Sequence, residues 1–486
     1  GDIVTFVDQG SQSFGEILSV RKDDCDVKIL VDKETYIGNI VVSVNPYKDL
    51  LIDGPEVMVK YFNRMLTSVP AGESGSGKTE AFKRITQYLA CTSEQGKNSL
   101  SSVARRVLES TPILESFGNA TTVRNDNSSR FGKLVEIFFA KSIIIGAKIT
   151  NFLLEKSRIV GQSEKERNYH VFYELLSSLD NESKAKHHLK NVEDYQYLMK
   201  DSRRAFSTHS DPDGLSMLLE SWQTLGLPQD EMDLCLRVIS AVLHLGNITF
   251  KSDNDKDNTF ITNPFVAEIA ASELGVGLTE LAKVITMKLT ETSIDKLWSP
   301  VNVAGAIVNR DSIAKSLYAE FFDRLVEKIN MKNAPPDYMD SDTKSSLRAI
   351  ALLDIYGFEN LPTNSLEQFC INYTNENLQQ FFNHNIFELE QEEYRAENIS
   401  WQYVQFPDNQ PIIDLIAGKP NGIMHLCNDE ASLVTVSPRS IQSFTKLLVE
   451  IFTIFNFPNQ LIKQKICLFF EVLAYHSFLC TKILHN

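Results

Sequence analysis

The sequence predicts an α/β fold in which a central, mostly parallel sheet is flanked by many helices. Two segments have the apolar and β-branched composition of strands, Val135–Phe139 and Ala349–Ile355. Between them, apolar residues recur at helical spacing, as in Leu236, Ile239 and Leu243. Strands separated by long helical stretches are typical of α/β proteins with a largely parallel sheet. Ala349–Ile355 is almost wholly apolar, so we expect this strand to be buried on both faces.

The N-terminal region predicts a small β module. Residues 1–32 alternate polar and apolar side chains, as in Val27–Val31, which indicates short antiparallel strands of an SH3-like kind. A β-branched run at Gly38–Val44 then predicts a further strand, which ends where Pro46 removes a backbone donor.

Bulk composition excludes several classes of protein. The formal net charge of -15 and a pI near 5.2 disfavour a nucleic-acid partner, because a phosphate backbone would be repelled. The 7 cysteines form no C-x-x-C pair, so we expect reduced thiols in the cytoplasm, and neither a disulfide framework nor a zinc site. The N-terminus has no secretory signal pattern. We expect no membrane span, because the most apolar stretch, Ile466–Cys480, is short and contains Glu471 and His476.

A glycine-rich loop that leads into an amphipathic helix is the sharpest motif in the chain. It satisfies G-x-x-x-x-G-K-[ST] with Gly72, Glu73, Ser74, Gly75, Ser76, Gly77, Lys78 and Thr79. The helix that follows carries Phe82, Ile85 and Leu89 on one face. Such a loop is typical of a P-loop NTPase core, because its backbone N–H groups converge on phosphates at a helix N-terminus. Lys78 adds a charge for the β and γ oxygens, and the Thr79 hydroxyl can ligate magnesium.

A second polar loop precedes the strand at Val135. It is formed by Asn125, Asp126, Asn127, Ser128, Ser129, Arg130, Phe131, Gly132 and Lys133. By itself this loop could be an ordinary turn. Beside a P-loop, its hydroxyls, amides and arginine favour a sensor of the γ-phosphate.

The third motif lies at the end of the predicted strand Ala349–Ile355. Asp354 emerges from that strand, which is where P-loop enzymes hold their metal from a second side. Gly357 permits close approach of the backbone to a phosphate, and Glu359 closes the motif. Alone, this pattern is equally compatible with a strand that ends in a turn.

The three motifs in this order resemble those of the myosin motor head. Kinesins share the glycine-rich loop and a related serine pair, but they differ at Phe131-Gly132 and after Asp354. Three more phrases match myosin landmarks: Glu155–Val160, Glu166–Phe172 and His244–Ile248. The resemblance covers roughly residues 34 to 432. Residues 401–410 look more like an unconventional myosin heavy chain than a muscle one.

The resemblance implies ATP and Mg²⁺ as cofactors. It implies that Lys78 binds phosphate, that Thr79 and Ser129 ligate Mg²⁺, and that Asp354 holds the metal from the second shell. It also implies that the other residues of the glycine-rich loop, Gly72–Gly77, bind the nucleotide together with Glu80 and Asn127. The purine pocket is implied at Asn45, Pro46 and Tyr47.

The same resemblance implies how ATP would be hydrolysed. Asn125 and Ser128 would orient the γ-phosphate and the attacking water, and the Gly357 N–H would sense that phosphate. Arg130 and Glu359 would form the ion pair that closes the site. The chain would then be an ATP phosphohydrolase.

A helix expected over Leu378–Glu390 has an apolar stripe that suits an ordinary amphipathic surface helix. The resemblance implies instead a relay helix that transmits switch-loop movement. It also implies filamentous actin as partner and a place on the cytoplasmic cytoskeleton. On this basis we expect a motor core over residues 33–432 and a divergent, aromatic-rich tail over 433–486.

Two departures from the family pattern favour an alternative interpretation. Between Asn45 and Gly72 the chain is about two dozen residues short, roughly one helix plus the strand that should lead into the loop. Beyond Leu433 we recognise no lower actin-binding region, converter, light-chain or calmodulin site. The alternative is a catalytically compromised, truncated myosin-like protein.

Overall fold

The structure is a computed structural model, and it describes residues 5–7, 14–16, 36–37, 40–41, 78–92, 102–123, 125–140, 143–198, 210–253, 256–291, 296–336, 347–359, 364, 366–403 and 405–431. The chain divides into two compact units. The first unit comprises Gly1–Leu50, Met65–Ser76 and Gly357–Asn486, and the second comprises Leu51–Arg64 and Gly77–Tyr356.

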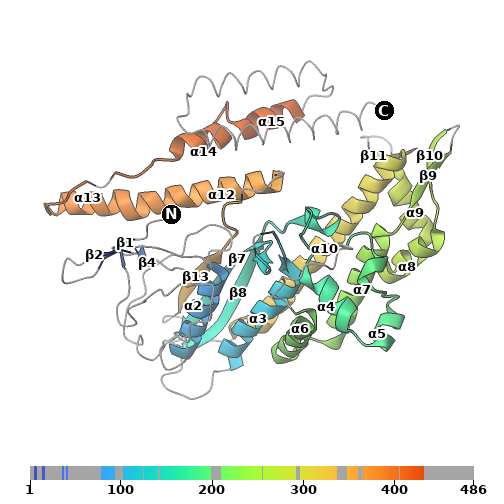
Figure 1. The fold of residues 1–486 in the computed structure, drawn as a ribbon, viewed down its shortest axis with the longest axis horizontal. Coiled ribbons are helices and arrows are strands. Elements are labelled where there is room, and N and C mark those ends of the chain that lie inside the picture. Colours follow the sequence, from blue (N-terminus) through green and yellow to red (C-terminus); the bar gives the residue numbers. More distant parts are fainter. Residues whose placement is uncertain are drawn as a thin grey trace. The chain divides into compact units, whose positions relative to one another are not determined.

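The second unit contains a three-stranded sheet, which Figure 1 shows beside helices α2 (Lys78–Thr92) and α3 (Ser102–Gly118). Its order is β13 (Arg348–Asp354), β7 (Gly132–Ala140) and β8 (Ile143–Phe152). The strands at Val135–Phe139 and Ala349–Ile355 are therefore confirmed within one to three residues. In the register of β13 and β7, Asp354 lies opposite Lys133.

All pairings in this described sheet are antiparallel, whereas we expected mostly parallel strands. Only two residues separate β7 from β8, and a connection that short can join antiparallel strands only. Strand β8 was not predicted from the sequence. The expected burial of β13 on both faces is also wrong, because Ile350 and Leu353 are 41% and 44% exposed.

Three helices form the core of the second unit with the sheet. The long helix α10 (Val303–Asn333) and α3 (Ser102–Gly118) both pack on β8, and α2 (Lys78–Thr92) packs on α3. Aromatic rings fill the space between them: the Phe131 and Phe322 centroids are 5.0 Å apart in an edge-on arrangement.

The second unit contains further helices, of which Figure 1 labels α4 to α9 in green to yellow-green. They are α4 (His170–Ser178), α5 (Asn181–Lys186), α6 (Asp211–Leu225), α7 (Gln229–Gly246), α8 (Pro264–Leu274), α9 (Leu278–Thr286) and the short 3₁₀ turns η1 (Lys156–Ile159) and η2 (Val192–Asp194). The two-stranded pieces are β5 (Asn119–Ala120) with β6 (Ser128–Ser129), β9 (Phe250–Asp253) with β10 (Lys256–Ile261), and β11 (Met287–Glu291) with β12 (Lys296–Pro300).

The helix expected after the glycine-rich loop is confirmed as α2, and the helical spacing of Leu236, Ile239 and Leu243 is confirmed by α7. The last residue of α7 is Gly246, and Asn247 is the cap. A Cβ at Gly246 would lie 2.7 Å from the Tyr197 ring, so glycine is required there by close packing.

In the first unit, β1 (Thr5–Val7) pairs antiparallel with β2 (Phe14–Glu16), and β3 (Tyr36–Ile37) with β4 (Ile40–Val41). These pairs agree with the strand pattern seen in the sequence. The SH3-like arrangement stays a prediction, and Val27–Val31 lies outside the described residues.

The predicted long helix of the first unit is confirmed, but it contains an unexpected turn. Helix α12 (Leu366–Asn383) continues through a π-helical turn at His384–Glu388 into α13 (Leu389–Ala396). The stripe side chain Phe381 is 67% exposed. Two shorter helices follow, α14 (Gln410–Ala417) and α15 (Ile423–Ala431).

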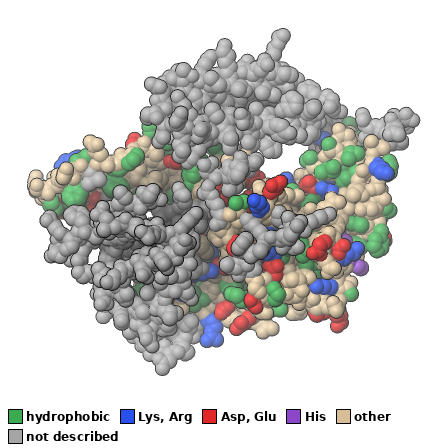
Figure 2. Space-filling view, in the orientation of Figure 1, with side chains coloured by type: hydrophobic (Ala, Val, Ile, Leu, Met, Phe, Trp, Pro, Cys, Tyr) green, Lys and Arg blue, Asp and Glu red, His purple; other side chains and the backbone are tan. Residues whose placement is uncertain are grey.

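Acidic, basic and hydrophobic side chains are interspersed over the described surface in Figure 2. No helix among the described residues is long and apolar enough to cross a bilayer. The apolar segment Ile466–Cys480 and the expected tail 433–486 lie outside the described residues.

Candidate functional site

The helix that follows the glycine-rich loop begins at Lys78. Thr79, the second residue of α2, therefore occupies its first turn, where backbone N–H groups have no partner within the helix. Several predicted nucleotide-binding positions lie outside the described residues: Gly72, Glu73, Ser74, Gly75, Ser76, Gly77, Asn45, Pro46 and Tyr47. The side chains of Lys78 and Glu80 do so as well.

Direct contacts bring together one residue from each of the three motifs. Thr79 Oγ1 donates to Asp354 Oδ1 at 3.3 Å, and it lies 3.5 Å from Ser129 Oγ. These residues are 275 and 50 positions apart in sequence from Thr79, so the fold, not local geometry, creates the cluster. The resemblance drawn from the three motifs implied that these residues share one site.

Asp354 is held by a second, buried contact. Its Oδ2 lies 3.5 Å from Lys133 Nζ, and both side chains are 3% exposed. Among the described residues this oxygen has no hydrogen-bond partner, and the Lys133 ammonium group offsets part of the cost of burying its charge. Lys133 Nζ also lies 4.5 Å from the Phe82 ring centre, close enough for a cation–π contact.

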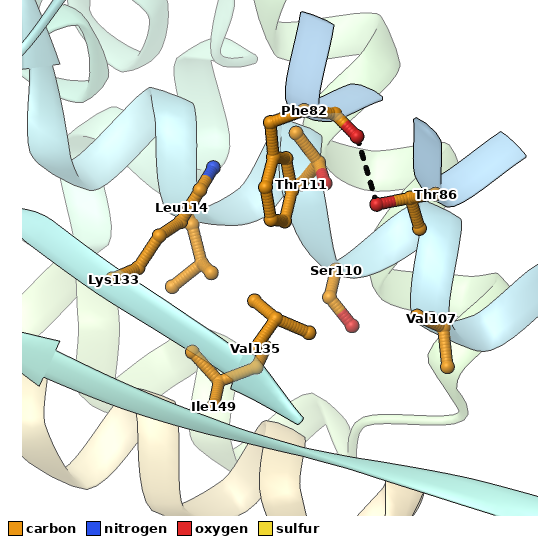
Figure 3. Close-up of a pocket in the computed structure, with 9 residues that line it drawn as sticks. All are labelled: Phe82, Thr86, Val107, Ser110, Thr111, Leu114, Lys133, Val135 and Ile149. Atoms are coloured by element: carbon orange, nitrogen blue, oxygen red, sulfur yellow. Dashed lines mark hydrogen bonds between the residues drawn. The ribbon is translucent and has the colours of Figure 1, made fainter. Parts of the chain in front are cut away.

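A small cavity lies behind Lys133, between α2, α3 and the sheet (Figure 3). Its lining residues are Phe82, Thr86, Val107, Ser110, Thr111, Leu114, Lys133, Val135 and Ile149. The Thr86 hydroxyl is used internally, because it donates to the Phe82 carbonyl at 2.9 Å. The lining of this cavity is thus mostly apolar.

The second motif is held by short pairing and by amide contacts within the loop. Ser128 and Ser129 form β6, which pairs with β5. Asn125 Oδ1 accepts from the Asn127 N–H at 3.0 Å, and Asn125 Nδ2 donates to the Asn127 carbonyl at 3.3 Å. Asn127 Oδ1 in turn accepts from Asn119 Nδ2 at 2.8 Å. Both amides therefore shape the loop, and their contact with nucleotide stays a prediction.

Arg130 lies in a buried ion cluster with Glu155, Arg158 and Glu166. Arg130 Nε donates to Glu155 Oε2 at 2.7 Å, and Arg158 Nε donates to the same oxygen at 2.6 Å. Arg158 also bonds Glu166 Oε2 at 2.9 Å. Burial alone would raise the pKa of Glu155, but the two arginines outweigh it and lower that pKa to about 2. Glu155 is therefore ionised at neutral pH.

Gly357 and Glu359 belong to the first unit, whereas Arg130 belongs to the second. Gly357 and Glu359 are both buried. The Glu359 N–H donates to Asn372 Oδ1, and Asn372 Nδ2 donates to the Glu359 carbonyl, each at 2.8 Å. These two hydrogen bonds connect Glu359 to helix α12. The predicted pair between Arg130 and Glu359 stays a prediction.

Two residues of this region were not identified as site residues from sequence. Lys133 breaks the apolar pattern of a strand that begins at Gly132, and it is 2% exposed, which is a rare position for lysine. Glu155 stands three residues before Arg158, a spacing that suits an ion pair on one helical turn. These sequence features do not indicate that Lys133 pairs with Asp354 or that Glu155 pairs with Arg130.

Comparison with known proteins shows the family to which the chain belongs. Residues 65–475 match the family described as Myosin head (motor domain). This span starts and ends later than the resemblance drawn from the motifs. The chain is 43% identical over 423 residues to unconventional myosin-XV of Homo sapiens, 40% over 407 to Myosin-2 of Lachancea kluyveri, and 41% over 426 to Myosin-I heavy chain of Dictyostelium discoideum.

Each of these alignments covers 82% of the chain, but only 12%, 26% and 18% of the respective relative. The chain thus spans about a quarter or less of the length of these relatives. The family match over residues 65–475 covers most of this chain and confirms the resemblance to the myosin motor head. The chain belongs to the myosin head (motor domain) family.

Proposed function

We propose that this chain is the nucleotide-hydrolysing part of an actin-based motor, an ATP phosphohydrolase that works with Mg²⁺ on the cytoplasmic cytoskeleton. The observation that carries the proposal is the meeting of Thr79, Ser129 and Asp354 within hydrogen-bond distance. Family membership supports the same activity, because the matched region is a motor domain.

The oxygens in this cluster suit Mg²⁺. Magnesium prefers oxygen ligands at 2.0–2.1 Å in octahedral geometry, which places neighbouring ligands about 3 Å apart. Thr79 Oγ1 and Ser129 Oγ are 3.5 Å apart, so a small adjustment would let both bind one ion. Asp354 Oδ1, which already accepts from Thr79, would hold the metal from its second shell. Mg²⁺, when bound, neutralises charge on the phosphate oxygens.

The rest of the chain would bind and orient the nucleotide. The loop Gly72–Gly77 and Lys78 would hold the phosphates, and the purine would lie at Asn45–Tyr47. Ser128 and Asn125 would orient the attacking water. Since Arg130 Nη1 donates to Ser128 Oγ at 3.2 Å, the arginine also sets the position of that hydroxyl.

Movement of the third motif would reach helix α12. In this proposal the Gly357 N–H senses the γ-phosphate, and Glu359 pairs with Arg130 when the site closes. The two hydrogen bonds between Glu359 and Asn372 would then pass the displacement to α12. A phosphate-dependent switch of this kind needs two arrangements with different affinity for the nucleotide.

A turnover assay tests this function. We expect the purified chain to hydrolyse MgATP, to be accelerated by filamentous actin, and to co-sediment with it. Asp354→Asn and Thr79→Val should each lower turnover about 100-fold, the usual order when a charge-stabilising group is lost. As a control, Ser216→Ala changes an exposed hydroxyl on α6 and should leave turnover unaltered.

The alternative, a catalytically compromised myosin-like protein, predicts a different result. In that case fluorescent nucleotide would not bind, or would bind without turnover, and actin would not pellet the chain. Absence of nucleotide binding would show that the chain has no working nucleotide site. Binding without turnover would show a nucleotide-binding protein without enzymatic activity.

A further inference from the structure

The buried ion cluster around Arg130 has a balanced composition. Arg130 and Arg158 contribute two positive charges, and Glu155 and Glu166 contribute two negative ones. All four are at most 8% exposed, so solvent contributes little to their stabilisation. Within this cluster Glu155 is the residue that contacts both arginines.

Glu155 fixes Arg130 at two points. Its carboxylate accepts from Arg130 Nε at 2.7 Å, and its backbone N–H donates to the Arg130 carbonyl at 2.9 Å. A guanidinium group is planar and rigid, so a bond at Nε sets the direction of the two terminal nitrogens. One of these, Nη1, donates to Ser128 Oγ at 3.2 Å. The chain of contacts therefore runs from Glu155 through Arg130 to Ser128.

A second arginine, Arg158, also fixes the Glu155 carboxylate. Arg158 Nε binds the same oxygen, and Arg158 is in turn bonded to Glu166 and to the Arg167 carbonyl at 2.9 Å each. The Glu155 carbonyl accepts from the Tyr169 hydroxyl at 2.9 Å. Glu155 thus has few ways to move, which is what a residue that orients another requires.

We propose that Glu155 is a positioning residue for ATP hydrolysis, which sets the orientation of Arg130 and, through it, of the Ser128 hydroxyl. This inference rests on the proposed function. Glu166 has a different place in the same cluster: among the described residues it contacts Arg158 and the Val123 N–H, whereas the bond to Arg130 Nε comes from Glu155.

The substitution Glu155→Gln tests the inference, with Glu166→Gln as its matched control. Each variant removes one buried negative charge beside Arg158, but only Glu155→Gln weakens the bond to Arg130 Nε. We expect Glu155→Gln to lower kcat about 100-fold, the size of effect expected from misplacing a reacting group, with KM for MgATP nearly unchanged. Glu166→Gln should keep kcat within about threefold. Equal losses in both variants would overturn the inference, since they would indicate a purely structural role.

A second readout separates this inference from the proposed function. The Nε–H signal of Arg130 in NMR spectra, assigned by its loss in Arg130→Lys, should be protected from solvent exchange in the unaltered chain and in Glu166→Gln. It should lose protection in Glu155→Gln. If Glu155→Gln does not fold, Glu155→Asp keeps the charge but shortens the side chain by one methylene, and should show the same loss. Retained protection would overturn the inference, whether or not the chain hydrolyses ATP.

Discussion

Replacement of Lys133 by methionine should destabilise the second unit strongly. The Lys133 ammonium group and the Asp354 carboxylate are 3.5 Å apart, and both side chains are 3% exposed. Methionine has a similar length and fills the same space, so the main change is the loss of the charge. Asp354 Oδ2 has no hydrogen bond to any described residue, so the variant would remove the one cation that the described part of the chain places beside this buried oxygen.

The size of this effect follows from distance and burial. Two unit charges 3.5 Å apart interact by about 5 kcal/mol at an effective dielectric constant of about 20. Removal of one partner of a buried pair costs about 3–5 kcal/mol in measured cases. We therefore expect Lys133→Met to lower the free energy of unfolding by about 3–5 kcal/mol.

Urea denaturation of the variants measures this change, and the double variant Lys133→Met/Asp354→Asn provides a thermodynamic cycle. Because Asp354→Asn removes the carboxylate charge that Lys133→Met leaves unpaired, it should restore about 1–3 kcal/mol of the free energy of unfolding. Lys283→Met is the control for the aromatic contact: Lys283 Nζ lies 4.4 Å from the Trp298 ring centre at an exposed site, and its loss should cost less than about 1 kcal/mol. A loss below about 1 kcal/mol in Lys133→Met, or a double variant no more stable than the single one, would refute the reasoning.

Three further predictions concern the second unit. Burial, and to a lesser degree nearby His188, lowers the pKa of His244 to about 4, so between pH 6.5 and 4 the unfolded chain binds the proton and the folded chain does not. Stability should therefore fall by roughly 3 kcal/mol as the pH drops through this window, and His244→Phe should remove that slope from urea midpoints measured against pH. Gly146→Ala would place a Cβ 2.6 Å from the Pro335 backbone nitrogen and should cost about 1–3 kcal/mol by thermal unfolding; an unchanged melting temperature would contradict the packing described. Tyr318→Phe removes the buried hydroxyl that donates to the Phe117 carbonyl at 2.7 Å, with an expected loss of about 1–3 kcal/mol in the same assay.

Local patterns in the sequence predicted the elements that surround the site. Apolar spacing located α2 and α7, and apolar runs located β7 and β13. The resemblance drawn from the three motifs implied that Thr79, Ser129 and Asp354 lie around one metal ion. Their contacts in the structure agree with that expectation.

Features that depend on long-range packing could not be predicted in the same way. An apolar strand indicates possible burial, yet the exposure of Leu353 depends on which layers cover β13. The π-helical turn at His384–Glu388 has no proline or glycine to mark it. The pairs of Lys133 with Asp354 and of Arg130 with Glu155 join residues 221 and 25 positions apart, and sequence spacing carries no information about such partners.

The most direct test of the central claim is the position of the metal in the nucleotide complex. Crystals of the chain grown with Mn²⁺ and a non-hydrolysable ATP analogue should give one anomalous difference peak about 2 Å from both Thr79 Oγ1 and Ser129 Oγ, with Asp354 beyond the first shell. A bound nucleotide whose metal lies away from these two hydroxyls, or no bound nucleotide at all, would contradict the account.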